Sequence, residues 1–236
     1  MKKISIILII MVGFLISCTK NFEDFNTDKK HATVVPAQFL FANAQKALAD
    51  MYSSTSVNIN NWKLFAQYWT ETTYTDESNY DVLNRNIGNT LFRIFYRDIL
   101  VDLKEAKRIT EEEVVDGEEA TIAKNNRLLI IDLVEVYTYQ QLVDIFGDVP
   151  YTEALDITNI SPAYDDASTI YKDLLTRAKT AADALSTDAG SFGGDDLMMG
   201  GDVAMWKKFA NTLIVRMAIT IAAKEPALAK GYIEGA

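Results

Sequence analysis

The sequence is almost without cysteine and histidine. Its 236 residues contain one cysteine, Cys18, and one histidine, His31. A single cysteine excludes an internal disulfide framework, and two such residues are too few for a Cys/His zinc site. No nucleophile stands in a recognisable arrangement with a base, and no phosphate-binding GxxxxGK loop occurs. We therefore predict a protein that is not an enzyme and has no cofactor, in which His31 is solvated.

Positive charge is also scarce. Lys and Arg number 23 against 33 Asp and Glu, which leaves a formal net charge of −10. Nucleic-acid binding depends on basic side chains that neutralise phosphates. The charge balance therefore predicts no nucleic-acid partner.

The one long apolar run lies at the N-terminus. Ile4 to Ile16 is apolar apart from Ser5 and Gly13, and it follows the positively charged Met1-Lys-Lys. This run is too short for a transmembrane helix but fits the apolar part of a secretory signal peptide. It ends in Leu15-Ile-Ser-Cys18, which resembles the lipobox of bacterial lipoproteins.

A lipobox implies that residues 1–17 are removed as a signal peptide and that Cys18 is acylated, including by palmitate. The alternative is an ordinary signal peptide followed by an incidental cysteine. Acyl chains on a tether of residues 18–35 would hold a domain of residues 36–236 at a membrane without a spanning helix. Thr19 and the acidic Asn21-Phe-Glu-Asp24 resemble signals for the outer membrane and its exterior face.

Helical periodicity dominates residues 36–236. Apolar residues at helical spacing predict helices that begin near Pro36, Asn60, Asn89, Glu118, Asp166 and Asp202. The helix over 118–146 is apolar almost all round, which predicts a central position. The residues from Tyr232 onward resemble the start of another helix with nothing to pack against. We predict an all-α fold in which the paired helices resemble tetratricopeptide hairpins.

A corner is predicted between two of these hairpins, over residues 144–156. Gly147 can take the left-handed conformation that ends a helix, and Pro150 prevents continuation of the helix. The corner therefore separates a hairpin over residues 89–146 from one that begins near Asp166 and is ended by Pro226.

Aromatic residues fall into two groups. Trp62, Trp69 and Trp206 lie at helical spacing and are predicted to be in the core. The loop over residues 70–86 instead combines aromatic, hydroxyl and amide side chains, and its candidate ligand-binding residues are Tyr74, Asp76, Asn79 and Tyr80. Aromatic rings stack on sugar faces while carboxylates and amides bond their hydroxyls. The alternative is that these tyrosines pack back onto the helices.

The acidic pairs are interpreted mainly as capping or solvated groups. Asp165-Asp166 and Asp195-Asp196 are adjacent in sequence, whereas glycoside hydrolases place two carboxylates across a cleft. Asp195, Asp196 and Asp202 are the candidate calcium ligands, because oxygen ligands on a glycine-rich loop suit that ion. Their spacing matches no known loop motif, so the prediction is that the protein has no metal centre.

Four stretches together resemble the SusD/RagB family of nutrient-binding outer-membrane lipoproteins. They are the lipobox with its acidic follow-up, Phe146-Gly-Asp-Val-Pro-Tyr-Thr-Glu-Ala-Leu155, Pro162-Ala-Tyr-Asp-Asp166, and the stretch from Gly200 to Ala218. The phrases Ala66-Gln-Tyr-Trp69 and Tyr74-Thr-Asp-Glu-Ser-Asn-Tyr80 are similar to the SusD-like branch. Members of the family are longer, so the resemblance implies that this chain is an N-terminal fragment.

The resemblance implies a surface lipoprotein that captures glycans or peptides, with glycans favoured. It would deliver them to a TonB-dependent outer-membrane transporter of the SusC/RagA type. The alternative is a helical scaffold that binds the transporter while another component binds the nutrient. An enzyme acting on complex glycans is the least favoured interpretation.

Overall fold

The computed structural model describes residues 34–236, and the described chain is helical. Its elements, in order, are α3 (Ala37–Ser53), α4 (Trp62–Phe65), η1 (Glu77–Asn79), α5 (Ile87–Arg93), η2 (Ile94–Leu100), α6 (Val101–Glu112), α7 (Glu118–Phe146), α8 (Ala167–Ala184), η3 (Gly193–Asp195), α9 (Val203–Ile221) and α10 (Pro226–Glu234). Within this range the only extended pairing is an isolated antiparallel bridge between Val149 and Asp165. The predicted all-α fold is confirmed.

The predicted signal peptide, Cys18 and His31 lie outside the described residues, as does nearly all of the predicted tether. None of the helices within residues 34–236 combines the length and the apolar character that a bilayer crossing requires.

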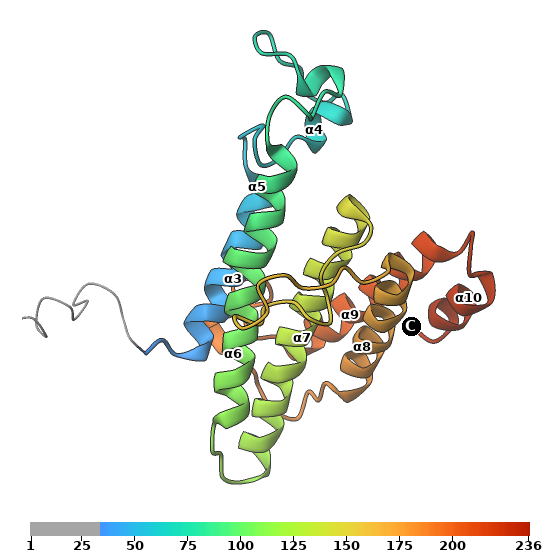
Figure 1. The fold of residues 1–236 in the computed structure, drawn as a ribbon. Helices are drawn as coiled ribbons and strands as arrows, with labels where there is room; N and C mark the ends of the chain where they lie inside the picture. Colours follow the sequence, from blue (N-terminus) through green and yellow to red (C-terminus); the bar gives the residue numbers. More distant parts are fainter. Residues whose placement is uncertain (1–33) are drawn as a thin grey trace, which may run out of the picture. The chain divides into compact units, whose positions relative to one another are not determined.

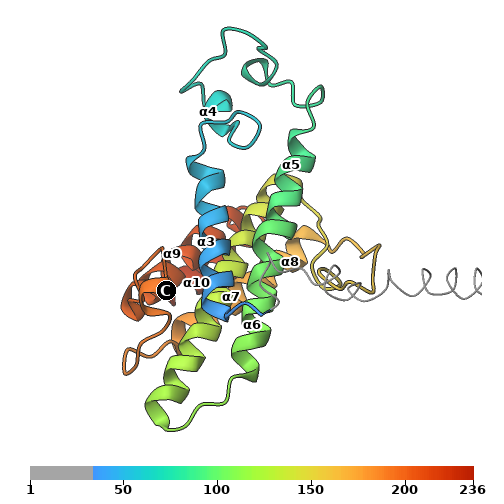
Figure 2. The same ribbon diagram turned by 90° about the vertical axis from the view of Figure 1, so that its left-hand side faces the viewer.

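The helices pack as successive antiparallel neighbours (Figures 1 and 2). The chain segment α3 lies along η2 and α6, α6 pairs with α7, α7 with α8, α8 with α9, and α9 with α10. The helix α7 contacts elements on both sides, and Ile130, Ile131 and Val136, which project from different sides of the helix, are fully buried. An amphipathic helix buries one stripe, so burial on several faces requires a central position. The predicted location of α7 is therefore confirmed.

The elements α5, η2 and α6 form one continuous helix with a π-helical stretch in its middle, Ile94–Leu100. A π-helical turn widens the helix locally and shifts the residues that follow around its axis. Phe95, Ile99 and Leu100 within this stretch are all fully buried. The neighbouring Tyr96 hydroxyl donates a 2.5 Å hydrogen bond to the carbonyl of Pro150, which ties this helix to the corner.

The corner after α7 forms where it is predicted. The helix ends at Phe146, and Gly147 N–H donates a 2.9 Å hydrogen bond to the carbonyl of Val143. Gly147 has φ of 75° and ψ of −121°, so its φ is positive although its ψ lies outside the left-handed helical region that the sequence suggests. The difference arises because the chain turns at once into the extended Val149, which pairs with Asp165.

The backbone at Gly147 gives a first stability prediction. A Cβ would meet no atom within 4 Å, so the cost of Gly147→Ala is the strained backbone alone. We expect a loss of about 1–3 kcal/mol in the free energy of unfolding. Gly190→Ala is the matched control, because Gly190 also has open space but no positive φ, and we expect a change within about 0.5 kcal/mol. Urea unfolding measures both, and equal effects of the two substitutions would contradict the assignment.

Acidic side chains cap the helices at two of the predicted helix starts. Asp166 accepts a hydrogen bond from Thr169 N–H at the start of α8, and Asp202 accepts one from Met205 N–H at the start of α9. These carboxylates satisfy backbone donors that have no partner within their helices. Asp166 and Asp202 therefore act as capping groups.

The glycine-rich loop between α8 and α9 is organised around Asp196. This carboxylate is buried and accepts five hydrogen bonds, from Gln45 Nε2 and Trp206 Nε1 and from the backbone N–H groups of Met198, Met199 and Gly201. Gln45 also accepts a 2.8 Å hydrogen bond from Leu197 N–H, so the loop is fixed to α3 as well as to α9. Among residues 34–236, no group of three or more His, Cys, Asp or Glu side chains is arranged to hold a metal ion. The geometry of Asp195, Asp196 and Asp202 does not support the calcium candidate.

Two sequence predictions about helices are wrong. The helix expected from Asn60 through Trp69 is the single turn α4, because Gln67 takes a positive φ of 58° that ends it. Trp206 is fully buried as predicted, but Trp62 is half-buried and Trp69 is exposed.

At the other end of the chain, α10 begins at Pro226 rather than near Tyr232. It packs on α9, and the Tyr232 hydroxyl lies 3.1 Å from that of Thr176 on α8.

Candidate ligand-binding site

Residues 54–86 form a lobe at one end of α3 and α5, and we call it the aromatic lobe (Figures 1 and 2). It contains α4 and η1, which contact each other. Four large aromatic side chains of the lobe are exposed to solvent: Tyr68 (84%), Trp69 (49%), Tyr74 (78%) and Tyr80 (56%). Exposed aromatic rings gathered in one region are typical of a binding surface.

Arg85 lies at the centre of the lobe and holds its loops together. Its Nε is 3.2 Å from Glu77 Oε1, and its Nη2 donates a 3.3 Å hydrogen bond to the carbonyl of Tyr74. The guanidinium carbon also lies 5.9 Å from the centre of the Tyr74 ring. Tyr74 has a positive φ of 57°, an unfavourable conformation for a bulky residue. The contacts with Arg85 hold Tyr74 in this conformation with its ring exposed.

The ring of Tyr80 is fixed by a second set of contacts. Its hydroxyl donates a 3.2 Å hydrogen bond to the carbonyl of Phe65 and accepts one from Gln67 Nε2 at 3.1 Å. The two rings of Tyr80 and Phe65 have centroids 5.6 Å apart. Tyr80 therefore packs one side against α4 and leaves the other in solvent, which combines the two alternatives that the sequence left open.

The four predicted ligand-binding residues all lie in the lobe, but their side chains differ in exposure and in the partners they already have. Asn79 Nδ2 donates hydrogen bonds to the carbonyl and hydroxyl oxygens of Thr75, at 2.8 and 3.1 Å. Asp76 is partly exposed and lies 4.0 Å from Arg85 Nε. Tyr74 and Tyr80 present ring faces to solvent. Ligand binding by these four residues remains a prediction, and the two tyrosines have the most suitable geometry for it.

A pocket of about 560 Å³ lies where the lobe meets α5 and the end of α7. This volume is in the range of small-molecule sites. Its apolar wall includes Trp62, Phe65 and Phe146. Its polar lining residues are Asn61, Asn84, Arg85, Asn86 and Asn89. Asn61 Oδ1 is buried and has no hydrogen-bond partner among residues 34–236, so it can accept a hydrogen bond from a ligand hydroxyl.

Sequence reasoning missed this pocket. Its amide groups come from both ends of the lobe, from Asn61 and from the stretch Asn84-Arg-Asn-Ile-Gly-Asn89, and they meet only in the fold. The repeated asparagines of the second stretch are the one signal that could have indicated a polar site.

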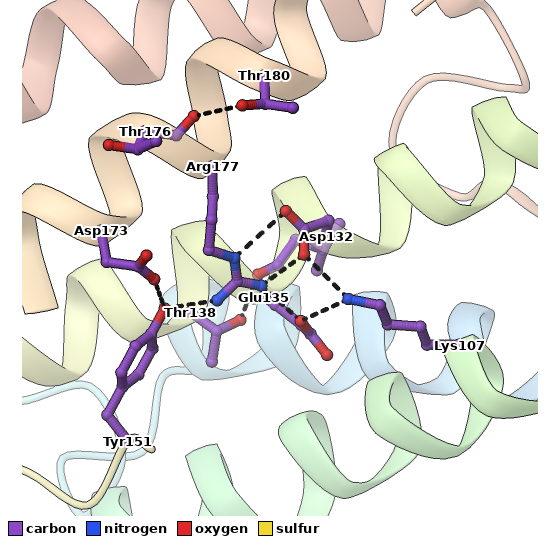
Figure 3. Close-up of polar contacts among 10 residues, drawn as sticks. Lys107, Asp132, Glu135, Thr138, Tyr151, Asp173, Thr176, Arg177 and Thr180 are labelled. Atoms are coloured by element: carbon purple, nitrogen blue, oxygen red, sulfur yellow. Dashed lines mark hydrogen bonds and ion pairs between the residues drawn. The ribbon is translucent and has the colours of Figure 1, made fainter. Parts of the chain in front are cut away.

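A second polar cluster lies between the two hairpins and is structural (Figure 3). We call it the Arg177 cluster, and its members are Lys107 on α6, Asp132 and Glu135 on α7, Tyr151 in the corner, and Asp173 and Arg177 on α8. Arg177 Nη2 lies 2.6 Å from Asp132 and 2.7 Å from Glu135, and Nη1 donates a 2.7 Å hydrogen bond to the Tyr151 hydroxyl. That hydroxyl donates to Asp173. The charged groups are paired with one another and tie the three helices to the corner.

Burial and pairing shift the pKa values of the cluster in opposite directions. Burial alone would raise the pKa of Asp132, but its hydrogen bond with Arg177 and the charges of Arg177 and Lys107 outweigh burial and lower it. Burial raises the pKa of Glu135, because the charges of Arg177 and Lys107 offset it only in part. Such shifts can mark catalytic sites, but here they arise from a closed network of ion pairs.

Comparison with known families identifies the fold. Residues 28–236 match a SusD-like family described as "Starch-binding associating with outer membrane". The chain belongs to the SusD-like family. The match covers all of the described residues, so the family resemblance seen in the sequence is confirmed. No curated protein matches the sequence.

Solved structures with the same SusD-like fold include a chitin-binding protein, with 24% identity and a TM-score of 0.69 over 84% of this chain and 41% of that one. A SusD homologue from Parabacteroides distasonis matches at 18% identity with a TM-score of 0.70, over 84% of this chain and 38% of the other. A chitin-binding SusD homologue from Flavobacterium johnsoniae matches at 21% identity with a TM-score of 0.60, over 81% of this chain and 41% of that one. This SusD-like chain spans about two fifths of the length of these structures.

Two of the four sequence stretches that resemble the SusD/RagB family have structural roles here. The first, which begins at Phe146, is the corner whose Tyr151 belongs to the Arg177 cluster. The second contains Asp202, which caps α9, and Trp206, which bonds Asp196. These phrases therefore specify the SusD-like scaffold, whereas the aromatic lobe is the candidate site that the scaffold holds.

Proposed function

We propose that this SusD-like protein binds glycans through the aromatic lobe, without catalysis. The observation that carries the proposal is the set of four exposed aromatic rings in the lobe, which also supplies part of a pocket with four asparagines in its lining. Aromatic rings stack on the C–H faces of sugars, and amides donate and accept hydrogen bonds with hydroxyls. The family description and the chitin-binding relatives support a glycan over a peptide.

The proposal extends to location and delivery. Cys18 carries the lipid anchor, the domain faces the cell exterior at the outer membrane, and the bound glycan passes to a TonB-dependent transporter of the SusC/RagA type. The lipobox resemblance and the family's association with the outer membrane support this part. Metabolic labelling with a clickable palmitate tests the anchor. Labelling of the wild type but not of Cys18→Ala is expected, and an unlabelled wild-type protein would reject lipidation.

Removing the two tyrosine rings tests the site. Tyr74→Ala with Tyr80→Ala should weaken the binding of glycans retained on an array by about tenfold or more, because each lost stacking contact costs about 0.5–1.5 kcal/mol. Tyr164→Ala is the matched control, because Tyr164 is an exposed tyrosine in the loop after the corner, outside the lobe. The Tyr164→Ala variant should bind the same glycans with the affinity of the wild type.

Three results on the full-length protein would redirect the proposal. Glycan affinity that survives the double substitution would reject these rings as the site. Binding of no glycan, together with capture of the transporter, would favour the scaffold alternative. Binding of peptides in place of glycans would reassign the ligand class.

A further inference from the structure

The charges of the aromatic lobe are unequal. Residues 54–86 contain two basic side chains, Lys63 and Arg85, and four acidic ones, Glu71, Asp76, Glu77 and Asp81, so the formal net charge is −2. Lys63 Nζ donates a 2.5 Å hydrogen bond to the carbonyl of Ser54 and lies 4.0 Å above the centre of the Trp69 ring. The ammonium group of Lys63 therefore already has partners within the lobe.

Among residues 34–236, Arg85 is the one charged residue that lines the pocket, and nearby acids compensate its charge. The fully buried carboxylate of Glu77 lies 3.2 Å from its Nε, and that of Asp76 lies 4.0 Å away. The two terminal nitrogens donate to Asn58 Oδ1 at 3.4 Å and to the carbonyl of Tyr74 at 3.3 Å. An arginine recognises a carboxylate through a free fork of parallel N–H groups. Each of the three guanidinium nitrogens of Arg85 is therefore already in contact with an oxygen of the lobe, which weakens its attraction for a ligand carboxylate.

The buried oxygen of Asn61 adds an independent requirement. Asn61 Oδ1 has no hydrogen-bond partner within the described part of the chain. A sugar hydroxyl can donate a hydrogen bond to this oxygen, whereas an ionised carboxylate only accepts. The pocket therefore favours a hydroxyl at this position, and a carboxylate placed there would gain no hydrogen bond from Asn61 Oδ1.

We infer that the site selects uncharged glycans and rejects glycans that carry carboxylates. This inference rests on the proposed function, because it names the ligand class of the same site. A carboxylate in the pocket would lie beside Arg85, whose charge Glu77 and Asp76 already balance, so it would lose its hydration without gaining a free counter-charge. Arg85 acts as a positioning residue that holds Tyr74, and Glu77 with Asp76 determines the charge preference.

Matched pairs of glycans provide the test. The array carries neutral oligosaccharides of glucose, galactose and N-acetylglucosamine, each beside the same oligosaccharide oxidised to the carboxylate at C6. For every neutral glycan that binds the full-length protein, we expect its oxidised partner to bind at least about tenfold more weakly. Equal or tighter binding of the oxidised partner would overturn the inference and leave the proposed function standing. Binding of neither member of any pair would overturn both.

A substitution locates the source of the preference. Asp76→Asn removes one of the two acids beside Arg85 at a partly exposed position, so the fold should tolerate it. We expect the affinity for the neutral glycan, divided by the affinity for its oxidised partner, to fall several-fold. Asp116→Asn is the control, since it removes the same charge at the α6–α7 turn, at the opposite end of these helices from the lobe (Figure 1). An equal change in the ratio for both variants would show that overall charge sets the preference and would overturn the role of this cluster.

Discussion

Arg177→Met is expected to lower the free energy of unfolding by about 3–5 kcal/mol, because it leaves buried carboxylates without their main partner. Methionine keeps much of the length of the arginine stem. The variant therefore loses chiefly the ion pairs with Asp132 and Glu135 and the hydrogen bond with Tyr151. Urea unfolding measures the loss. These contacts join the two hairpins, so the expected loss is a direct measure of how much the Arg177 cluster stabilises the scaffold.

The matched control for this substitution is Arg108→Met. Arg108 forms ion pairs with Glu105 at 2.6 Å and Glu112 at 2.8 Å, but on the exposed face of α6. Exposed pairs of this kind contribute about 0–1 kcal/mol. A loss at Arg177 no larger than that at Arg108 would contradict the structural role of the cluster.

The effect at Arg177 should also depend on pH. Without the guanidinium, burial would raise the pKa values of Asp132 and Glu135 in the folded protein above their unfolded values. The folded variant would then bind more protons than the unfolded chain, so its stability would rise as the pH falls through that range. We therefore expect the difference in unfolding free energy from the wild type to shrink between neutral and mildly acidic pH. A constant difference would show that the loss comes from packing rather than from buried charge.

The second large effect is expected at Asp196. Asp196→Asn should lower the free energy of unfolding by about 2–4 kcal/mol, because hydrogen bonds to a charged acceptor contribute about 1.5–3 kcal/mol each and are not additive. An amide presents one acceptor oxygen and one donor nitrogen to a site that contains five N–H donors. At least one donor, Trp206 Nε1 or a backbone N–H, would then face another donor.

Asp195→Asn is the control for this prediction. Asp195 is the preceding residue in the same loop and is only half-buried. We expect a change within about 0.5 kcal/mol. If the two substitutions had similar effects on thermal unfolding, the central role of Asp196 in the loop would be rejected.

The scaffold could be predicted from the sequence because its signals are local. The start of α7 after Gly117 and its end before Gly147, the caps Asp166 and Asp202, and the burial of Trp206 each depend on residues close in the chain. Helix periodicity and capping are short-range properties. The corner also formed as expected, although the ψ value of Gly147 differs from the predicted conformation.

The candidate site could be predicted only in part. The composition of residues 70–86 indicated a binding loop, but α4 was expected to continue through Trp69. It ends early because Gln67, like Tyr74 and Tyr80, has a positive φ, which no local pattern indicates for residues other than glycine. The pocket was missed because Asn61 and Asn84 lie more than twenty positions apart and meet only in the fold.

Hydrogen–deuterium exchange of the full-length protein, with and without a neutral glycan that the array identifies, tests the central claim most directly. Backbone amides of residues 54–86 should become protected when the glycan binds, and those of the loop between Tyr151 and Asp166 should not change. Protection confined to other parts of the protein, with the aromatic lobe unaffected, would contradict the assignment of the lobe as the ligand-binding site.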